Sequence, residues 1–287
     1  DIMRFLDNVL TDFINKAPDS FANAKYAAAR ERSVGLGVMG LHSYFQQKGI
    51  PFGSVMSKVW NKKIFALIQK KVDQASKDLA EERGACPDAE EFGIKERFSN
   101  KTAIAPTASI SIICGGASPG IEPIAANSYT HKTLSGSYNV RNKYLTKILE
   151  KHGKNTDEVW STITTNQGSV SHLEFLTKEE KETFKTAFEI DQRWIVELGA
   201  DRTPHISQAQ SVNVFVPADV HKKDLHQLHF QAWKKGLKSL YYCRSKSIQR
   251  AENINAGSST DVTKNVYSNK KESSNEDNKY EECLSCQ

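Results

Sequence analysis

Two stretches of the chain carry the apolar spacing of amphipathic helices. In the first, apolar residues recur every three or four positions and predict a helix over the opening of the chain: Ile2, Phe5, Leu6, Val9, Leu10 and Phe13. In the second, residues 61–84, Gly84 is a stop signal and one face is formed by Ile64, Ile68, Val72, Ala75 and Leu79. Because the helical pattern is already under way at residue 2, we expect a piece of a larger protein.

A glycine-rich apolar run, GLGVMG, lies between these two helices. Gly35, Gly37 and Gly40 match the spacing of a dinucleotide-binding loop only superficially. Such a loop needs a strand before it and an acidic residue on a second strand after it, whereas the preceding residues here are charged and helical in pattern. The run therefore favours a tightly packed helix in which the glycines permit close backbone contact.

Strand-like and helical patterns alternate in the remainder. Residues 101–123 read as a short buried strand, a hydroxyl-rich turn and a loop rich in Gly and Pro. Thr177 and Glu180 form a capping box that opens a helix running to Gly199. Farther on, two strand-like segments, 211–216 and 237–242, flank a helix over about residues 221–235, capped by Asp219 and ended by Gly236.

The order strand, helix, strand predicts a parallel pair joined by a right-handed crossover, so the fold class is α/β. Residues 1–245 are expected to form the folded part. From residue 246 to residue 287 the sequence is rich in Ser, Asn, Lys and Glu, which predicts a disordered carboxy-terminal tail.

Composition narrows the function classes. The 287 residues are 38% hydrophobic, which is enough for a buried core. The sequence shows neither a run of eighteen apolar residues nor a leader-like segment, so no membrane partner is predicted. A cytoplasmic location is the default expectation. The net charge of +5 comes from 39 basic and 34 acidic side chains that are interspersed, which predicts no direct nucleic-acid binding. Five cysteines, an odd number, indicate reduced thiols.

The first candidate site is the hydroxyl-rich turn at residues 106–111. Pro106 disfavours helix just before it, and Thr107, Ser109 and Ser111 place three hydroxyls among backbone N–H groups. A capped turn is the plainer interpretation of this stretch alone, and a cradle for a phosphate is the alternative.

The second candidate is the pair Tyr241 and Tyr242, at the end of a predicted strand. Adjacent strand residues face opposite sides of a sheet, so both could be ordinary core residues with bonded hydroxyls. Tyrosine is also among the few side chains that can be oxidised at biological potentials, so the pair could relay an electron and a proton.

The third candidate is Cys283-x-x-Cys286, in the polar tail. A zinc site needs four ligands, and no second pair of ligands lies nearby, so no metal site is predicted. A tail of about forty residues reaches roughly 35 Å, which suits a dithiol that travels to other disulfides. Cys86, Cys114 and Cys243 are interpreted as buried or half-buried apolar residues.

The order of these motifs is more specific than any one of them. APTASIS, GIEP, QSVNVF, a helix running into LKSLYY and a terminal C-x-x-C follow one another, with RSVGLGVMGLHSYF and LAEERGACP nearer the start. This order resembles the carboxy-terminal portion of the large, catalytic subunit of class I ribonucleoside-diphosphate reductase. The resemblance implies a ten-stranded α/β barrel made of two antiparallel halves of five parallel strands, of which this chain would form the second half. It also implies the reduction of ribonucleoside diphosphates to deoxyribonucleoside diphosphates.

The resemblance assigns roles residue by residue. Five residues match the loop that holds the substrate diphosphate: Thr107, Ala108, Ser109, Ile110 and Ser111. Four more match a loop lining the same pocket: Gly120, Ile121, Glu122 and Pro123. Tyr241 and Tyr242 match the stacked tyrosines that pass the radical to the active-site cysteine. Cys283 and Cys286 match the tail dithiol that reduces the active-site disulfide and is itself restored by thioredoxin or glutaredoxin.

The departures from the family are equally informative. The N-x-C-x-E stretch with the radical-bearing cysteine does not occur, and Cys114 matches nothing catalytic. We therefore expect no turnover by this chain alone, and a complementary amino-terminal chain that carries that cysteine, the disulfide pair and the ATP and deoxynucleotide effector sites. No cofactor is expected on this chain; the radical would come from the dinuclear-metal and tyrosyl cofactor of a small subunit. The alternatives are an adenosylcobalamin-dependent reductase fragment, an inactive fragment and a thiol-bearing binding module.

Overall fold

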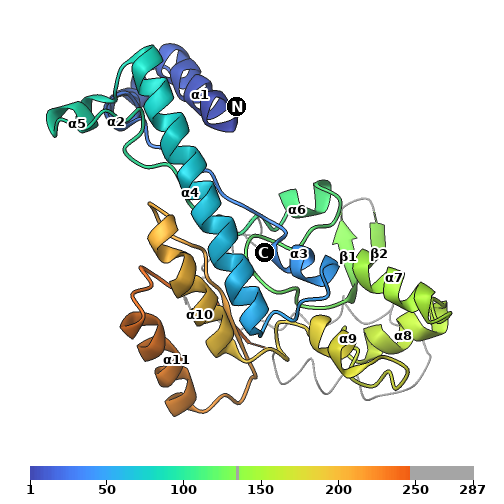
Figure 1. Cartoon of the computed structure of the whole chain (residues 1–287). Helices are drawn as coiled ribbons and strands as arrows, with labels where there is room; N and C mark the ends of the chain where they lie inside the picture. The colour runs from blue at the N-terminus through green and yellow to red at the C-terminus, as the bar shows by residue number, and fades with distance from the viewer. Residues whose placement is uncertain (134–135, 246–287) are drawn as a thin grey trace, which may run out of the picture.

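The structure is a computed structural model that describes residues 1–133 and 136–245. The long helix α4 (Val55–Arg83) runs through it as a central spine (Figure 1). A capping box at Ser54 and Ser57 starts this helix, and it ends at Gly84 as the sequence predicts. The predicted apolar face is confirmed: Val72 and Leu79 are buried, and the other three apolar residues pack beside them or on the neighbouring core. The predicted tail and its two cysteines lie outside the described residues.

The other elements group around this spine. Helices α1, α2 and α5 gather at one end of α4, α10 and α11 lie beside its other half, and the hairpin β1–β2 lies with α7 and α8 on the opposite side (Figure 1). Their bounds are α1 Ile2–Lys16, η1 Asp19–Phe21, α2 Ala22–Glu31, α3 Leu41–Gln47, α5 Pro87–Glu91, α6 Ile110–Ile113, β1 Ser128–Thr133, β2 Gly136–Arg141, α7 Lys143–Lys151, α8 Asp157–Thr165, α9 Lys178–Thr183, α10 Gln192–Arg202, η2 Thr203–His205, β3 Val214–Val216, α11 Lys222–Lys234 and β4 Cys243–Ser245. No described helix is long and apolar enough to cross a bilayer.

Four extended segments lie side by side in the order in which they occur in the chain. Residues 34–36 pair with 101–103 through a parallel bridge between Leu36 and Thr102, and Ile104 forms the next parallel bridge with Gln210. Strand β3 then pairs in parallel with β4, so the predicted parallel pair is confirmed. These bridged segments form the framework between the loops and helices, and the main core packs against it from α3, α4 and α10.

The GLGVMG run is extended, so the predicted helix there is wrong. Helix α3 begins only at Leu41, and Leu36 belongs to the parallel bridge. A Cβ atom on Gly37 would lie 2.4 Å from the backbone oxygen of Ala103, a distance that real Cβ atoms do not adopt. The glycines serve the close backbone contact that the sequence indicates, but between neighbouring strands.

The helix predicted from Thr177 to Gly199 is two helices. The capping box of Thr177 and Glu180 is present, but α9 ends at Thr183 and α10 begins at Gln192. Asp191 supplies a second amino-terminal cap by accepting a hydrogen bond from the backbone of Arg193. Apolar residues between the helices, among them Ala187 and Ile190, are buried and continue the helical spacing across the break.

The last predicted helix is confirmed with a different cap, whereas the strand predicted at residues 237–242 is wrong in position. His221, in place of Asp219, caps α11, and its ring nitrogen accepts from the backbone of Lys223. Strand β4 starts at Cys243, after the segment 237–242 that the sequence marks as a strand. Gly236 adopts a left-handed φ of 77°, and Leu237 and Leu240 pack into the core as part of the connection.

A buried carboxylate fastens α1 to the end of the spine. Asp7 is fully buried, although the predicted apolar stripe of α1 at Ile2, Phe5 and Val9 is exposed. The side chain of Asp7 forms ion pairs with three guanidinium groups, those of Arg32, Arg83 and Arg97. Their hydrogen bonds hold the pKa of Asp7 below its usual range in spite of burial, which opposes that shift.

Candidate functional site

One cavity is lined by residues from three of the motifs that the sequence singles out, APTASIS, GIEP and QSVNVF, but by neither tyrosine. It has a volume of about 670 Å³ and lies between the 106–123 region and the ends of β3 and β4. Its wall includes Pro106, Ala108, Pro119, Glu122, Pro123, Ala125, Phe188, Asn213, Phe215, Cys243, Arg244 and Ser245. Three of the residues assigned by the resemblance, Ala108, Glu122 and Pro123, therefore share a cavity with the strand that follows the tyrosine pair.

The hydroxyl-rich turn is held in a tight backbone conformation. Thr107 has a φ of 55°, which is rare for a β-branched residue, and its Oγ1 accepts a hydrogen bond of 2.7 Å from the backbone N of Gly120. Because that hydroxyl acts as an acceptor here, its own proton is available to a phosphate oxygen. Ser109 and Ile110 are exposed, and Ser111 is buried, donating to the carbonyl oxygen of Ala108.

The loop at residues 120–123 packs directly against the turn. Gly120 has a φ of 47°, and a Cβ atom there would lie 2.9 Å from the carbonyl oxygen of Ala105. Glycine is thus required both by conformation and by close approach. The next residues, Ile121, Glu122 and Pro123, are all buried, so this loop is a fixed floor for the turn above it.

A buried polar chain runs from this floor to the tyrosine pair. Asn213, which is 1% exposed, donates from Nδ2 to Oε1 of Glu122 and accepts at Oδ1 from the backbone N of Tyr242. Burial raises the pKa of Glu122 to about 7, against the opposing effects of the nearby Arg244 guanidinium and the Asn213 hydrogen bond. A carboxyl group poised near neutral pH can exchange a proton with groups in the cavity.

The rings of Tyr241 and Tyr242 contact each other in a tilted arrangement. Their ring centroids lie 4.1 Å apart, with the planes inclined by 50°, and the hydroxyl of Tyr241 donates to that of Tyr242 over 3.4 Å. The expectation that they face opposite sides of a sheet is wrong, because both precede β4 and only their backbone groups join the ladder to β3. Each is a little over two-fifths exposed, so neither is a core residue.

The cysteines within the described residues fall into two kinds. Cys86 is fully buried, as predicted, whereas Cys114 and Cys243 are exposed and the apolar interpretation of these two is wrong. Cys114 follows the short helix α6, whose turn projects into solvent, and Cys243 lies on β4 facing the cavity.

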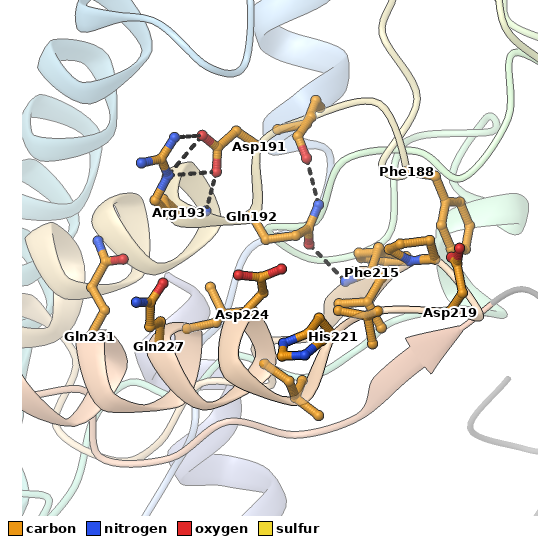
Figure 2. A pocket seen from close by; sticks show the side chains of 16 residues that line it. Phe188, Asp191, Gln192, Arg193, Phe215, Asp219, His221, Asp224, Gln227 and Gln231 are labelled. Atoms are coloured by element: carbon orange, nitrogen blue, oxygen red, sulfur yellow. Dashed lines mark hydrogen bonds and ion pairs between the residues drawn. The ribbon is translucent and has the colours of Figure 1, made fainter.

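A larger cavity of about 910 Å³ lies beyond the first, between α10 and α11 (Figure 2). Gln192 spans its upper wall, accepting from the backbone N of Phe215 and donating to two carbonyl groups. The rings of Phe188 and Phe215, 5.4 Å apart and nearly perpendicular, line both cavities. Among the residues that the structure describes, none of those assigned by the resemblance lines this second cavity.

Sequence reasoning missed two members of the site, Asn213 and Arg244. Asn213 is the one amide side chain within the apolar strand pattern SVNVFV, and that polar interruption is the signal that could have found it. Arg244 lies with its guanidinium 5.8 Å from the ring centroid of Tyr242, and its Nε has no hydrogen-bond partner among the described residues. Arg244 belongs to none of the motifs, and the one sequence feature that marks it is its position two residues after Tyr242.

The parallel segments follow one another in chain order with helices between them, which is the arrangement of part of an α/β barrel. The cavity described above lies at the end of these segments. The family model described as "Ribonucleotide reductase, barrel domain" matches residues 2–93 and 88–243. The chain therefore belongs to the ribonucleotide reductase large-subunit family, as the order of its motifs predicts.

Individual relatives agree with this assignment. The chain is 47% identical to the ribonucleoside-diphosphate reductase large subunit of Invertebrate iridescent virus 6 over 89% of its length, and 31% identical to that of Caenorhabditis elegans over 85%. Among solved structures, the Actinobacillus ureae class Id ribonucleotide reductase alpha subunit is 40% identical and superposes with a TM-score of 0.79 over 86% of this chain.

The chain spans only part of each of these proteins. It covers 27% of the iridescent virus subunit, 35% of the C. elegans subunit and 45% of the Actinobacillus alpha subunit. The chain thus corresponds to only one portion of the barrel that the resemblance implies.

Proposed function

We propose that this chain supplies part of the active site of a class I ribonucleoside-diphosphate reductase, the enzyme that reduces ribonucleoside diphosphates to deoxyribonucleoside diphosphates for DNA synthesis. The observation that carries the proposal is the cavity lined by Ala108 of the hydroxyl-rich turn, by Glu122 and by residues 243–245, which directly follow the tyrosine pair. A binding loop and a redox-active pair need to be neighbours only if both serve one reaction.

The turn at residues 107–111 is suited to hold the substrate diphosphate. The hydroxyls of Thr107 and Ser109 and the backbone N–H groups at the start of α6 are donors, which is what phosphate oxygens need. Glu122 and its loop would form the opposite wall. Pro123 and Gly120 fix that wall by their restricted backbone positions.

The adjacent tyrosines, whose ring centroids lie 4.1 Å apart, are suited to relay a radical. When a tyrosyl radical forms on one ring, the hydroxyl of the other can give up one electron and one proton, which restores the first phenol and leaves the radical on the second. The 3.4 Å hydroxyl contact provides the path for that proton. The final hydrogen donor would be a cysteine thiol on the complementary part of the large subunit, which becomes a thiyl radical.

The remaining roles fall to partners. A small subunit would generate the radical with its dinuclear-metal and tyrosyl cofactor, and effector nucleotides would bind the complementary large-subunit part. Cys283 and Cys286 would re-reduce the active-site disulfide and be restored by thioredoxin or glutaredoxin. A reductase of the adenosylcobalamin type makes its radical in place and needs no tyrosine pair, so Tyr241 and Tyr242 favour class I.

The test is reconstitution. The chain, the complementary large-subunit part, a class I small subunit and thioredoxin are expected to reduce CDP together, with no activity when this chain is omitted. Cys283→Ser is expected to allow a single turnover and to block thioredoxin-driven multiple turnovers. Failure to associate with the complementary part, or activity of the chain alone, would contradict the proposal; salt-sensitive DNA binding would favour the binding-module alternative.

A further inference from the structure

A fully buried histidine contacts the loop that forms the floor of the site. His42 lies in the first turn of α3, is 0% exposed, and packs edge to face on Phe52 with ring centroids 5.3 Å apart. Its Nδ1 accepts a hydrogen bond of 3.0 Å from the backbone N of Ile124, the residue that follows Pro123. The reaction outlined above has no use for this side chain.

The same turn of α3 holds the other end of the loop. The backbone N of Gly40 donates to the carbonyl oxygen of Ser118 at 2.8 Å. Ser43 and Ser118 form a reciprocal pair, because the backbone N of each donates to the side-chain hydroxyl of the other, at 3.1 and 2.8 Å. Both serines are buried. The segment 118–124 is therefore fastened at both ends to one helical turn.

The charge state of His42 follows from its surroundings. Burial lowers its pKa to about 3, with a smaller opposing effect from the backbone of Thr183. Nε2 has no hydrogen bond of good geometry among the described residues. The ring is thus neutral, which leaves Nδ1 as an acceptor that a protonated imidazole would not offer.

We propose that His42 is a positioning residue for substrate binding: its Nδ1 fixes the end of the 120–123 loop, while Ser43 and Ser118 fix the beginning. The inference rests on the proposed function, since it assigns His42 to the wall of the diphosphate site. A loop that grips a non-reacting part of the substrate acts on ground state and transition state alike. Loosening it is expected to raise KM and to leave kcat nearly unchanged.

Two substitutions of equal shape isolate the acceptor. Asn and Leu both branch at Cγ, and His42→Asn can place Oδ1 where Nδ1 stands, whereas His42→Leu offers no acceptor. Both remove the same part of the ring and the same contact with Phe52. In the reconstituted reductase, His42→Leu is expected to raise KM for CDP about 10-fold, the effect of one lost hydrogen bond, while His42→Asn stays within about twofold of the wild type.

Hydrogen exchange in residues 118–126 of the assembled enzyme is a second readout. It is expected to be faster in His42→Leu than in His42→Asn. Equal KM in wild type and His42→Leu, or an equal rise in both variants, would overturn the inference. If His42→Leu does not assemble, Ser43→Ala decides: it removes the acceptor of the Ser118 N–H at the other end of the loop, and an unchanged KM would overturn the inference as well.

The result separates the inference from the function on which it rests. Thr107→Val removes a hydroxyl from the diphosphate loop itself. If this variant raises KM while His42→Leu does not, only the positioning role fails. If neither changes KM, the assignment of the loop to the substrate fails.

Discussion

The side-chain amide of Asn213 donates to the carboxyl group of Glu122, a residue 91 positions earlier in the chain. With its oxygen, the same amide accepts from the backbone N of Tyr242. One buried side chain thus sets the distance between the floor of the cavity and the tyrosine pair. Because Asn213 directly precedes β3 and the other two groups come from neighbouring segments, the start of this strand defines the geometry of the site.

The buried carboxyl of Glu122 is expected to make stability depend on pH. Its pKa of about 7 exceeds that of an unfolded glutamate, so the folded state retains a proton that the unfolded state releases between pH 4.5 and 7. The free energy of unfolding therefore falls as pH rises through this window, by up to about 3 kcal/mol from this group. In Glu122→Gln this contribution is absent. Urea titrations at pH 5 and pH 7.5 measure it, with the exposed Glu174→Gln as control; equal pH slopes in wild type and Glu122→Gln would contradict it.

The hydroxyl of Thr107 is expected to matter more than its shape. Thr107→Val keeps the branched side chain but removes the acceptor of the Gly120 N–H and the hydroxyl donor that we propose for the substrate. We expect KM for CDP to rise about 10-fold, as for the loss of one or two hydrogen bonds. Thr107→Ser retains the hydroxyl and should remain within about threefold of the wild type. Steady-state kinetics of the reconstituted enzyme compare the KM values of the two variants. A higher KM in Thr107→Ser than in Thr107→Val would argue against a role of the Thr107 hydroxyl in substrate binding.

The tyrosine pair is expected to be needed for activity and to contribute little to stability. Phe retains the ring contact, and both residues are more than two-fifths exposed, so the midpoint of thermal unfolding should move by less than about 3 °C. Turnover in Tyr241→Phe and in Tyr242→Phe should fall to background, because a phenylalanine cannot be oxidised at the same potential. Tyr26→Phe, at an exposed tyrosine far from the cavity, is the control. Normal activity in the double variant would exclude the relay.

The Asp7 cluster is expected to be a major support of the spine. Removing the carboxylate leaves three guanidinium groups facing one another, and breaking such a buried group of charges costs about 3–5 kcal/mol. Asp7→Asn is therefore expected to lower the unfolding free energy by about that amount. Asp12→Asn breaks an exposed ion pair with Lys16 on the same helix and should cost less than about 0.5 kcal/mol. Chemical denaturation of both variants provides the comparison; similar losses would show that the cluster has no special role.

The sequence predicts best where local signals and packing agree. Helix α4 carries both an apolar face and a glycine stop, and the predicted face and carboxy-terminal end are correct, whereas its start at Val55 lies six residues before the predicted one. The capping box at Thr177 identifies the start of α9 for the same reason, but the far end of that helix is wrong since the apolar spacing continues through an irregular segment. A periodic pattern reports which side chains are buried, not whether the backbone between them is continuous.

The site shows a different limit. Motifs placed the hydroxyl-rich turn and the GIEP loop in one pocket through family resemblance, but the contact between Glu122 and Asn213 joins residues far apart in the chain. Such a pair leaves no spacing that a single sequence reveals. The hairpin β1–β2 was missed too, because its strands are largely polar and lack the apolar alternation that marks a half-buried strand.

The four parallel segments have a consequence for assembly. Within residues 1–133 and 136–245, no strand is hydrogen-bonded to the outer side of β4 or to the outer side of residues 34–36. Each margin thus presents a row of backbone donors and acceptors that can template a further strand. A complementary chain could dock by extending the sheet at either margin without rearranging the segments already paired, whereas the chain kept by itself at high concentration should tend to stack on its own copies.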